Sequence, residues 1–124
     1  IITARGLIVD IRNYLLQEIL TAYGGSPVLG DTRNGILAKI LLQVGGTARN
    51  PLIRNMLLAD ILATVGGSYD GATSRNELLK RIVVVSGGAV AHDSDRNSLL
   101  GDWLNAVNGV PIGSAYTQEY NESY

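Results

Sequence analysis

The 124-residue sequence contains no cysteine, no phenylalanine, one histidine, one tryptophan and three prolines. Without cysteine the chain can form neither a disulfide nor a thiolate metal site. Ten basic and eleven acidic side chains leave a net charge of −1, without the basic excess that is usual for nucleic-acid or acidic-membrane binders. No apolar run approaches the roughly 18 to 20 residues that cross a bilayer. Hydrophobic residues make up 46% of the chain, which is enough to build a buried core.

A 21-residue repeat organises most of the sequence. Arg-Asn pairs recur at a constant step of 21 residues, and a Gly-Gly pair follows each of the first four. Copies in constant phase are the signature of a repeat architecture. The residues that define the repeat are Arg12, Asn13, Arg33, Asn34, Arg54, Asn55, Arg75, Asn76, Arg96, Asn97, Gly24, Gly45, Gly66 and Gly87. We therefore divide the chain into a lead-in segment (1–11), a five-copy repeat domain (12–109) and a Tyr-rich polar tail (110–124).

Each copy carries the pattern of one short amphipathic helix. In the third copy Leu57, Leu58, Ile61 and Leu62 fall on one side of a helix of about ten to twelve residues. The first glycine of each pair marks the helix end, because glycine adopts the left-handed conformation without a Cβ penalty. Two positions compete as N-cap: the residue before the arginine, such as Ser74, and the asparagine after it. We favour the asparagine because all five copies have it.

A single copy cannot fold alone. Five buried apolar side chains contribute about 8 to 15 kcal/mol, whereas ordering 21 residues costs on the order of 30 kcal/mol. The copies must therefore cover one another's apolar stripes, within one chain or between chains. We predict an all-α fold of five 21-residue one-helix repeats, stacked as a short α-solenoid-like array with irregular loops between them. The fifth copy has Trp103 in place of isoleucine, and we expect it to be a terminal cap.

The sequence shows no recognisable catalytic constellation. The Gly-Gly pairs follow helices, whereas phosphate loops precede them, and no Gly-Lys-Ser or Gly-Lys-Thr motif is present. His92 has neither further ligands nor a nucleophile at a known spacing. We therefore predict that the protein is not an enzyme, and we expect no metal, no cofactor and no small-molecule substrate.

The five repeated arginines raise an electrostatic question. A cation beside a helix N-terminus opposes the helix dipole, so each arginine should have a compensating partner. In one interpretation the arginines donate hydrogen bonds to carbonyls or to an acidic residue of the adjacent repeat. In the other they form a positive stripe that binds an anionic surface, which the net charge of −1 disfavours.

Three tyrosines at a spacing of four, Tyr116, Tyr120 and Tyr124, lie in the polar tail. Tyrosine combines apolar area with a polar tip and is common at interfaces. The tail is therefore either a polar chain end or a segment that docks onto a neighbouring subunit.

The repeat, carried by TRNGILAKILLQVGG and SRNELLKRIVVVSGG, resembles short helical repeats in virion structural proteins of tailed bacteriophages, marine and cyanobacterial phages in particular. The resemblance spans about residues 12 to 109 and brings no catalytic residues. It implies a structural or assembly protein in the head, neck or fibre of a virion. Its partners would be protein subunits in a homo-oligomer or larger assembly, with no nucleic acid and no membrane. The alternative is a cellular solenoid-type binding module that recognises a protein or glycan through its variable loops.

Overall fold

The computed structural model describes residues 11–28, 30–69, 74–90 and 95–108. These residues form one helix per repeat and no strand, which confirms the predicted all-α repeat array. The helices are α1 (Ile11–Ala22), α2 (Arg33–Gln43), α3 (Arg54–Thr64), α4 (Arg75–Val85) and α5 (Arg96–Asn108). The predicted lead-in segment up to residue 10, His92, and the tail with Tyr116, Tyr120 and Tyr124 lie outside the described residues.

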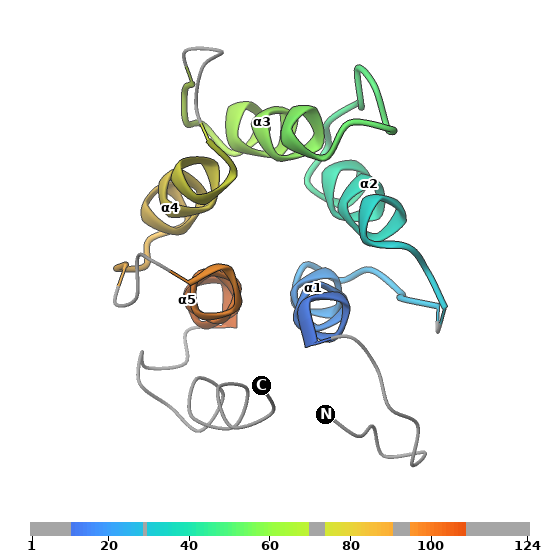
Figure 1. Ribbon diagram of the computed structural model, residues 1–124, viewed down its shortest axis with the longest axis horizontal. Helices are drawn as coiled ribbons and strands as arrows, with labels where there is room; N and C mark the ends of the chain where they lie inside the picture. The colour runs from blue at the N-terminus through green and yellow to red at the C-terminus, as the bar shows by residue number, and fades with distance from the viewer. Residues whose placement is uncertain (1–10, 29, 70–73, 91–94, 109–124) are drawn as a thin grey trace.

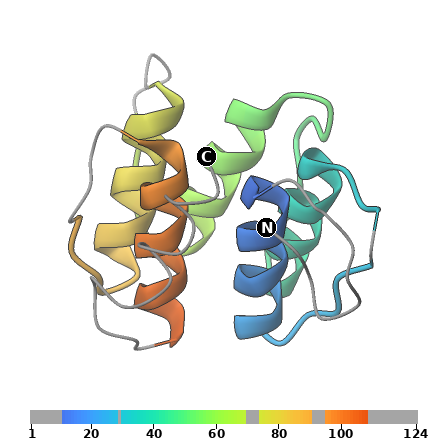
Figure 2. The ribbon, with the colours of Figure 1, turned by 60° about the horizontal axis from the view of Figure 1, so that its bottom comes forward.

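The helices are arranged in a closed ring. Each helix packs against the next one along the chain, and α5 also packs against α1, so the first and last repeats are neighbours (Figure 1). Figure 2 shows α1 and α5 side by side at the front of the ring. We call this contact between α1 and α5 the seam. All five apolar stripes are consequently covered within a single chain.

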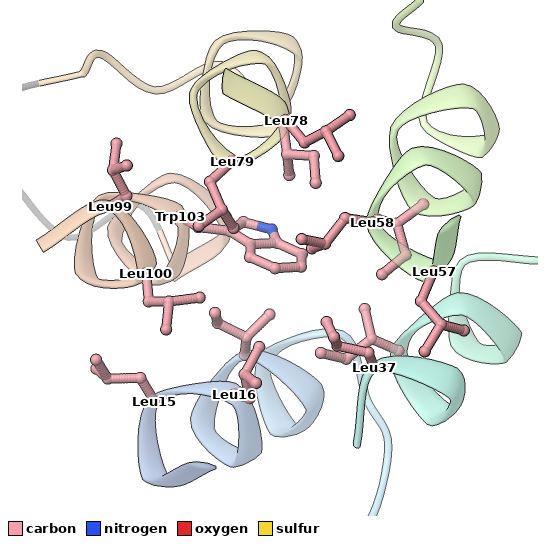
Figure 3. Close-up of a cluster of buried hydrophobic side chains, with 14 of the residues drawn as sticks. Leu15, Leu16, Leu37, Leu57, Leu58, Leu78, Leu79, Leu99, Leu100 and Trp103 are labelled. Atoms are coloured by element: carbon pink, nitrogen blue, oxygen red, sulfur yellow. The ribbon is translucent and has the colours of Figure 1, made fainter. Parts of the chain in front are cut away.

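The prediction that the fifth copy caps an open array is wrong. A cap has one neighbour, whereas α5 packs against both α4 and α1. The unusual Trp103 instead fills the interior, where it is completely buried (Figure 3). Its indole Nε1 donates a hydrogen bond to the Tyr23 hydroxyl of the first repeat at 3.1 Å, and the two rings meet edge to face. Trp103 therefore packs the centre of the ring and links the two sides of the seam.

Each glycine pair ends its helix through two different effects. The first glycine has a positive φ in every pair, for example +104° at Gly66, which confirms its predicted role as the helix stop. The second glycine is needed for space, because a Cβ at Gly67 would collide with the Leu62 side chain. The Gly67 N–H in turn donates to the Leu62 carbonyl at 2.8 Å, which closes the last turn.

The N-caps differ from the predicted ones. Thr32 and Ser74, which precede the arginines, accept hydrogen bonds from the backbone N–H of Gly35 and Glu77. The prediction that the asparagine after each arginine caps its own helix is therefore wrong. The asparagine side chains are used by a neighbouring repeat, as described below.

Replacing Trp103 by isoleucine would make the fifth copy match the others at this position. We nevertheless expect Trp103→Ile to lower the free energy of unfolding by about 2 kcal/mol or more, because it leaves a cavity at the ring centre and removes the hydrogen-bond donor to Tyr23. Urea denaturation would measure the change. Ile61→Val, at the equivalent position of α3, should cost only about 0.5 to 1.5 kcal/mol. If Trp103→Ile were as stable as the parent, isoleucine would fill the centre of the ring as well as tryptophan does, and this prediction would be wrong.

Candidate functional site

The five arginines of the repeat are linked to the five asparagines by a cycle of hydrogen bonds. In each case the Nε of an arginine donates to the side-chain oxygen of the asparagine in the preceding repeat. The pairs are Arg33–Asn13 at 2.9 Å, Arg54–Asn34 at 2.7 Å, Arg75–Asn55 at 2.7 Å and Arg96–Asn76 at 2.8 Å. The cycle closes across the seam, where Arg12 donates to Asn97 at 2.7 Å. We call Arg12, Arg33, Arg54, Arg75 and Arg96 the arginine ring.

These bonds show how each arginine of the ring is held beside its helix N-terminus. The acceptor of each Nε does lie in the adjacent repeat, but it is a side-chain amide where a carbonyl or an acidic residue was expected. The amide of Asn34 is held from its other end as well, since its Nδ2 donates to the Leu52 carbonyl at 3.2 Å. Arg12, Arg33, Arg54 and Asn13 make further interactions in addition to these. The ring bonds therefore position the guanidinium groups without neutralising them.

The arginine ring surrounds one cavity of about 30 Å³ on the ring axis. Below the guanidinium groups, one leucine from each repeat lines the same cavity: Leu16, Leu37, Leu58, Leu79 and Leu100. All five leucines are buried, whereas the arginines are half-buried, so the arginines lie at the solvent side. Among the described residues that line the cavity, none is acidic.

The charges of the arginine ring repel one another. Burial lowers the pKa of Arg75 below its usual value, and repulsion from the other four arginines lowers this pKa further. Arg49 provides a contrast within the same chain. Its Nε donates to the Asp60 carboxylate at 2.5 Å, and this bond raises the pKa of Arg49. Arg49 therefore has the carboxylate partner that an exposed arginine commonly finds, whereas the arginine ring gathers positive charge at one point.

Helix ends add to the positive potential at the cavity. The arginines stand in the first turn of their helices, so the five N-terminal ends meet around the same axis. Each helix N-terminus carries a partial positive charge of roughly half a unit. The buried leucine floor excludes water, and electrostatic interactions are stronger in such surroundings. The axial end of the ring can consequently attract an anion although the whole chain has a net charge of −1.

Several other charged side chains hold loops in place away from the cavity. Lys39 pairs with Asp31 at 2.6 Å, and Arg49 donates both to Asp60 and to the Tyr69 hydroxyl. Within the described residues no group of three or more histidine, cysteine or acidic side chains could hold a metal ion. The arginine ring is therefore the strongest candidate for a functional site in the described part of the chain.

Comparisons with protein-family models, with curated proteins and with solved structures find no match to this chain. The resemblance to bacteriophage virion repeats therefore stays a prediction. No helix among the described residues has both the length and the apolar character to cross a membrane.

The closed cycle of hydrogen bonds predicts that Asn97, at the seam, stabilises the fold as much as an asparagine inside the array does. Asn55→Ala should lower the free energy of unfolding by about 1 to 3 kcal/mol, because it leaves the Nε of Arg75 without its acceptor. In a closed ring Asn97→Ala should cost a similar amount, since Asn97 accepts from Arg12. Chemical denaturation would compare the two variants, with Gln43→Ala on the exposed end of α2 as a control expected within about 0.5 kcal/mol of the parent. If Asn97→Ala behaved like this control, the seam would not close through this bond.

Proposed function

We propose that this protein is a non-enzymatic binding domain that holds an anionic group at its arginine ring. The observation that carries this proposal is the convergence of five guanidinium groups, one from each repeat, on a single cavity, where the Nε of each donates to a neutral amide. Like charges brought together at a cost in folding energy point to a ligand that compensates them.

The chemistry of the guanidinium group supports this proposal. Arginine presents five N–H donors in a rigid plane that matches carboxylate and phosphate groups. The ring bonds use only Nε, and Arg75 and Arg96 make no other hydrogen bond to the described residues. Their Nη groups are therefore available for a ligand. No nucleophile, general acid or general base lines the described cavity, so the arrangement supports binding rather than catalysis.

Asn55→Asp gives a sharp test of anion binding. Aspartate keeps an oxygen acceptor for Arg75, so the fold and its stability should be retained, but its negative charge neutralises part of the ring. We expect this variant to bind anions at least about tenfold more weakly than the parent, which corresponds to the loss of about 1.4 kcal/mol. Isothermal titration with inorganic phosphate, tripolyphosphate and heparin, each at the same ionic strength, would measure the change.

Gln43→Glu is the matched control, because it also adds one negative charge but lies exposed at the opposite end of α2. Its anion affinity should equal that of the parent. If the parent bound none of these anions, or if both variants bound them as the parent does, the arginine ring would be a purely structural feature.

A role in assembly is a second candidate function, and it also accords with the resemblance to virion repeats. Large apolar side chains are exposed on the outside of the ring, with Leu42 68%, Leu52 83% and Val84 61% exposed. Because the ring covers its own apolar stripes, subunit contacts would have to use such outer residues rather than the stripes. In this function the domain would be a rigid adaptor within a homo-oligomer or particle.

Native mass spectrometry tests the assembly role. An assembly protein should give a species heavier than the 13.2 kDa monomer, and Leu42→Ser combined with Val84→Ser should shift it to the monomer by removing apolar contact area. Ala63→Ser, at the equivalent position of α3, should leave the assembly unchanged. A parent protein that is monomeric at all concentrations would favour the alternative of a monomeric binding module.

A further inference from the structure

Building on the anion-binding function proposed above, we infer that the ligand is a single tetrahedral oxyanion of the phosphate type, bound on the ring axis so that it joins the first repeat to the last. The inference rests on the size of the cavity, on the arrangement of donors around it and on the position of the seam.

The cavity has room for one small group only. A water molecule needs about 10 to 15 Å³ of such space, and the axial cavity offers about 30 Å³. A single oxyanion group can therefore enter, whereas a nucleobase or a sugar ring cannot. The buried leucine side chains close the inner end, for example Leu58 and Leu79, so a polyanionic strand could not thread through the ring.

The donors surround the axis, and this arrangement favours a tetrahedral group over a planar one. A carboxylate has two oxygens in one plane and is satisfied by one or two arginines. A phosphate group presents three or four oxygens in different directions, so it can accept hydrogen bonds from arginines on opposite sides of the cavity. Its charge also compensates more of the repulsion that acts on Arg75.

The ligand would act on the seam, whose two helices are not consecutive in the chain. Neighbouring helices elsewhere are joined directly by a loop, but α1 and α5 are the two ends of the repeat domain. Arg12 and Asn97, which meet at the seam, are 85 residues apart in sequence. Bringing such distant segments together costs chain entropy. A group that contacts Arg12 and Arg96 together would stabilise the closed ring, because it binds the closed form in preference to an open one.

The phosphate group could come from free phosphate, from a phosphate monoester or from the head group of an acidic lipid. The three sources share the chemistry that the arginine ring recognises, and they differ in what lies outside the cavity. Titrations with inorganic phosphate, glycerol phosphate and phosphatidic-acid vesicles, with acetate as the planar anion, would distinguish them at constant ionic strength.

We expect inorganic phosphate to bind one to one, acetate to bind at least about tenfold more weakly, and the melting temperature to rise with phosphate concentration. Asn55→Asp should remove the rise and Gln43→Glu should keep it. If glycerol phosphate also binds, the ring takes esters; if only the vesicles bind, the lipid is the source. If tripolyphosphate or heparin binds in an Asn55→Asp-sensitive way while phosphate does not, this inference is overturned and the anion-binding function survives. Absence of binding by every anion overturns both.

The seam itself can be followed with spin labels, because the chain has no native cysteine. Thr21→Cys and Asn108→Cys place exposed labels on α1 and α5, and Gln43→Cys with Ala63→Cys places an exposed control pair on α2 and α3. Phosphate should narrow the distribution of distances between the two labels of the α1–α5 pair and leave the distribution of the α2–α3 control pair unchanged. Phosphate binding without any change at the seam would overturn the proposed link between the first and last repeats.

Discussion

The hydrogen bond from each arginine to the asparagine of the preceding repeat determines the form of the whole molecule. Every copy supplies one donor and one acceptor, so an open array would leave an arginine at one end and an asparagine at the other without this bond. A buried polar group that loses its partner costs about 1 to 3 kcal/mol. The pair Arg12–Asn97 satisfies both ends at once. Closure of the ring thus meets a requirement that is already present in each repeat.

The choice of an amide as acceptor has an electrostatic consequence. A carboxylate at the asparagine positions would also accept from the arginines, and it would neutralise them, as Asp60 does for Arg49. The amide holds the guanidinium groups in place and leaves their charge, and the lowered pKa of Arg75 reflects the resulting repulsion together with burial. An amide at this position therefore gives up the ion pair that a carboxylate in the same place would form. A choice of residue that lowers local stability in this way is characteristic of functional sites.

Much of the fold follows from local signals in the sequence, and these could be predicted. The helices follow from the spacing of apolar residues, and their ends follow from glycines such as Gly66, whose positive φ depends on one residue alone. The N-cap prediction is wrong because the side chain of an asparagine such as Asn34 has its partners in another repeat. Closure could not be predicted from the repeat pattern, since the pattern does not show that an asparagine accepts from the next arginine, nor that the last copy meets the first through Arg12 and Asn97. From the sequence alone Trp103 consequently indicates the end of an array, although in the structure it fills the centre of the ring.

The net charge of the chain does not reveal the cluster of arginines, for a related physical reason. Summing charges over the chain gives −1, because eleven acidic side chains outnumber ten basic ones. Electrostatic interactions between exposed charges fade over roughly 8 to 10 Å in physiological salt, so a ligand responds to the charges around its own site. A repeat that closes on itself brings the same position of every copy to one axis, and one arginine per repeat becomes five around a single cavity. The concentration of positive charge around one cavity is therefore a property of the closed ring, which neither the composition nor a single repeat possesses.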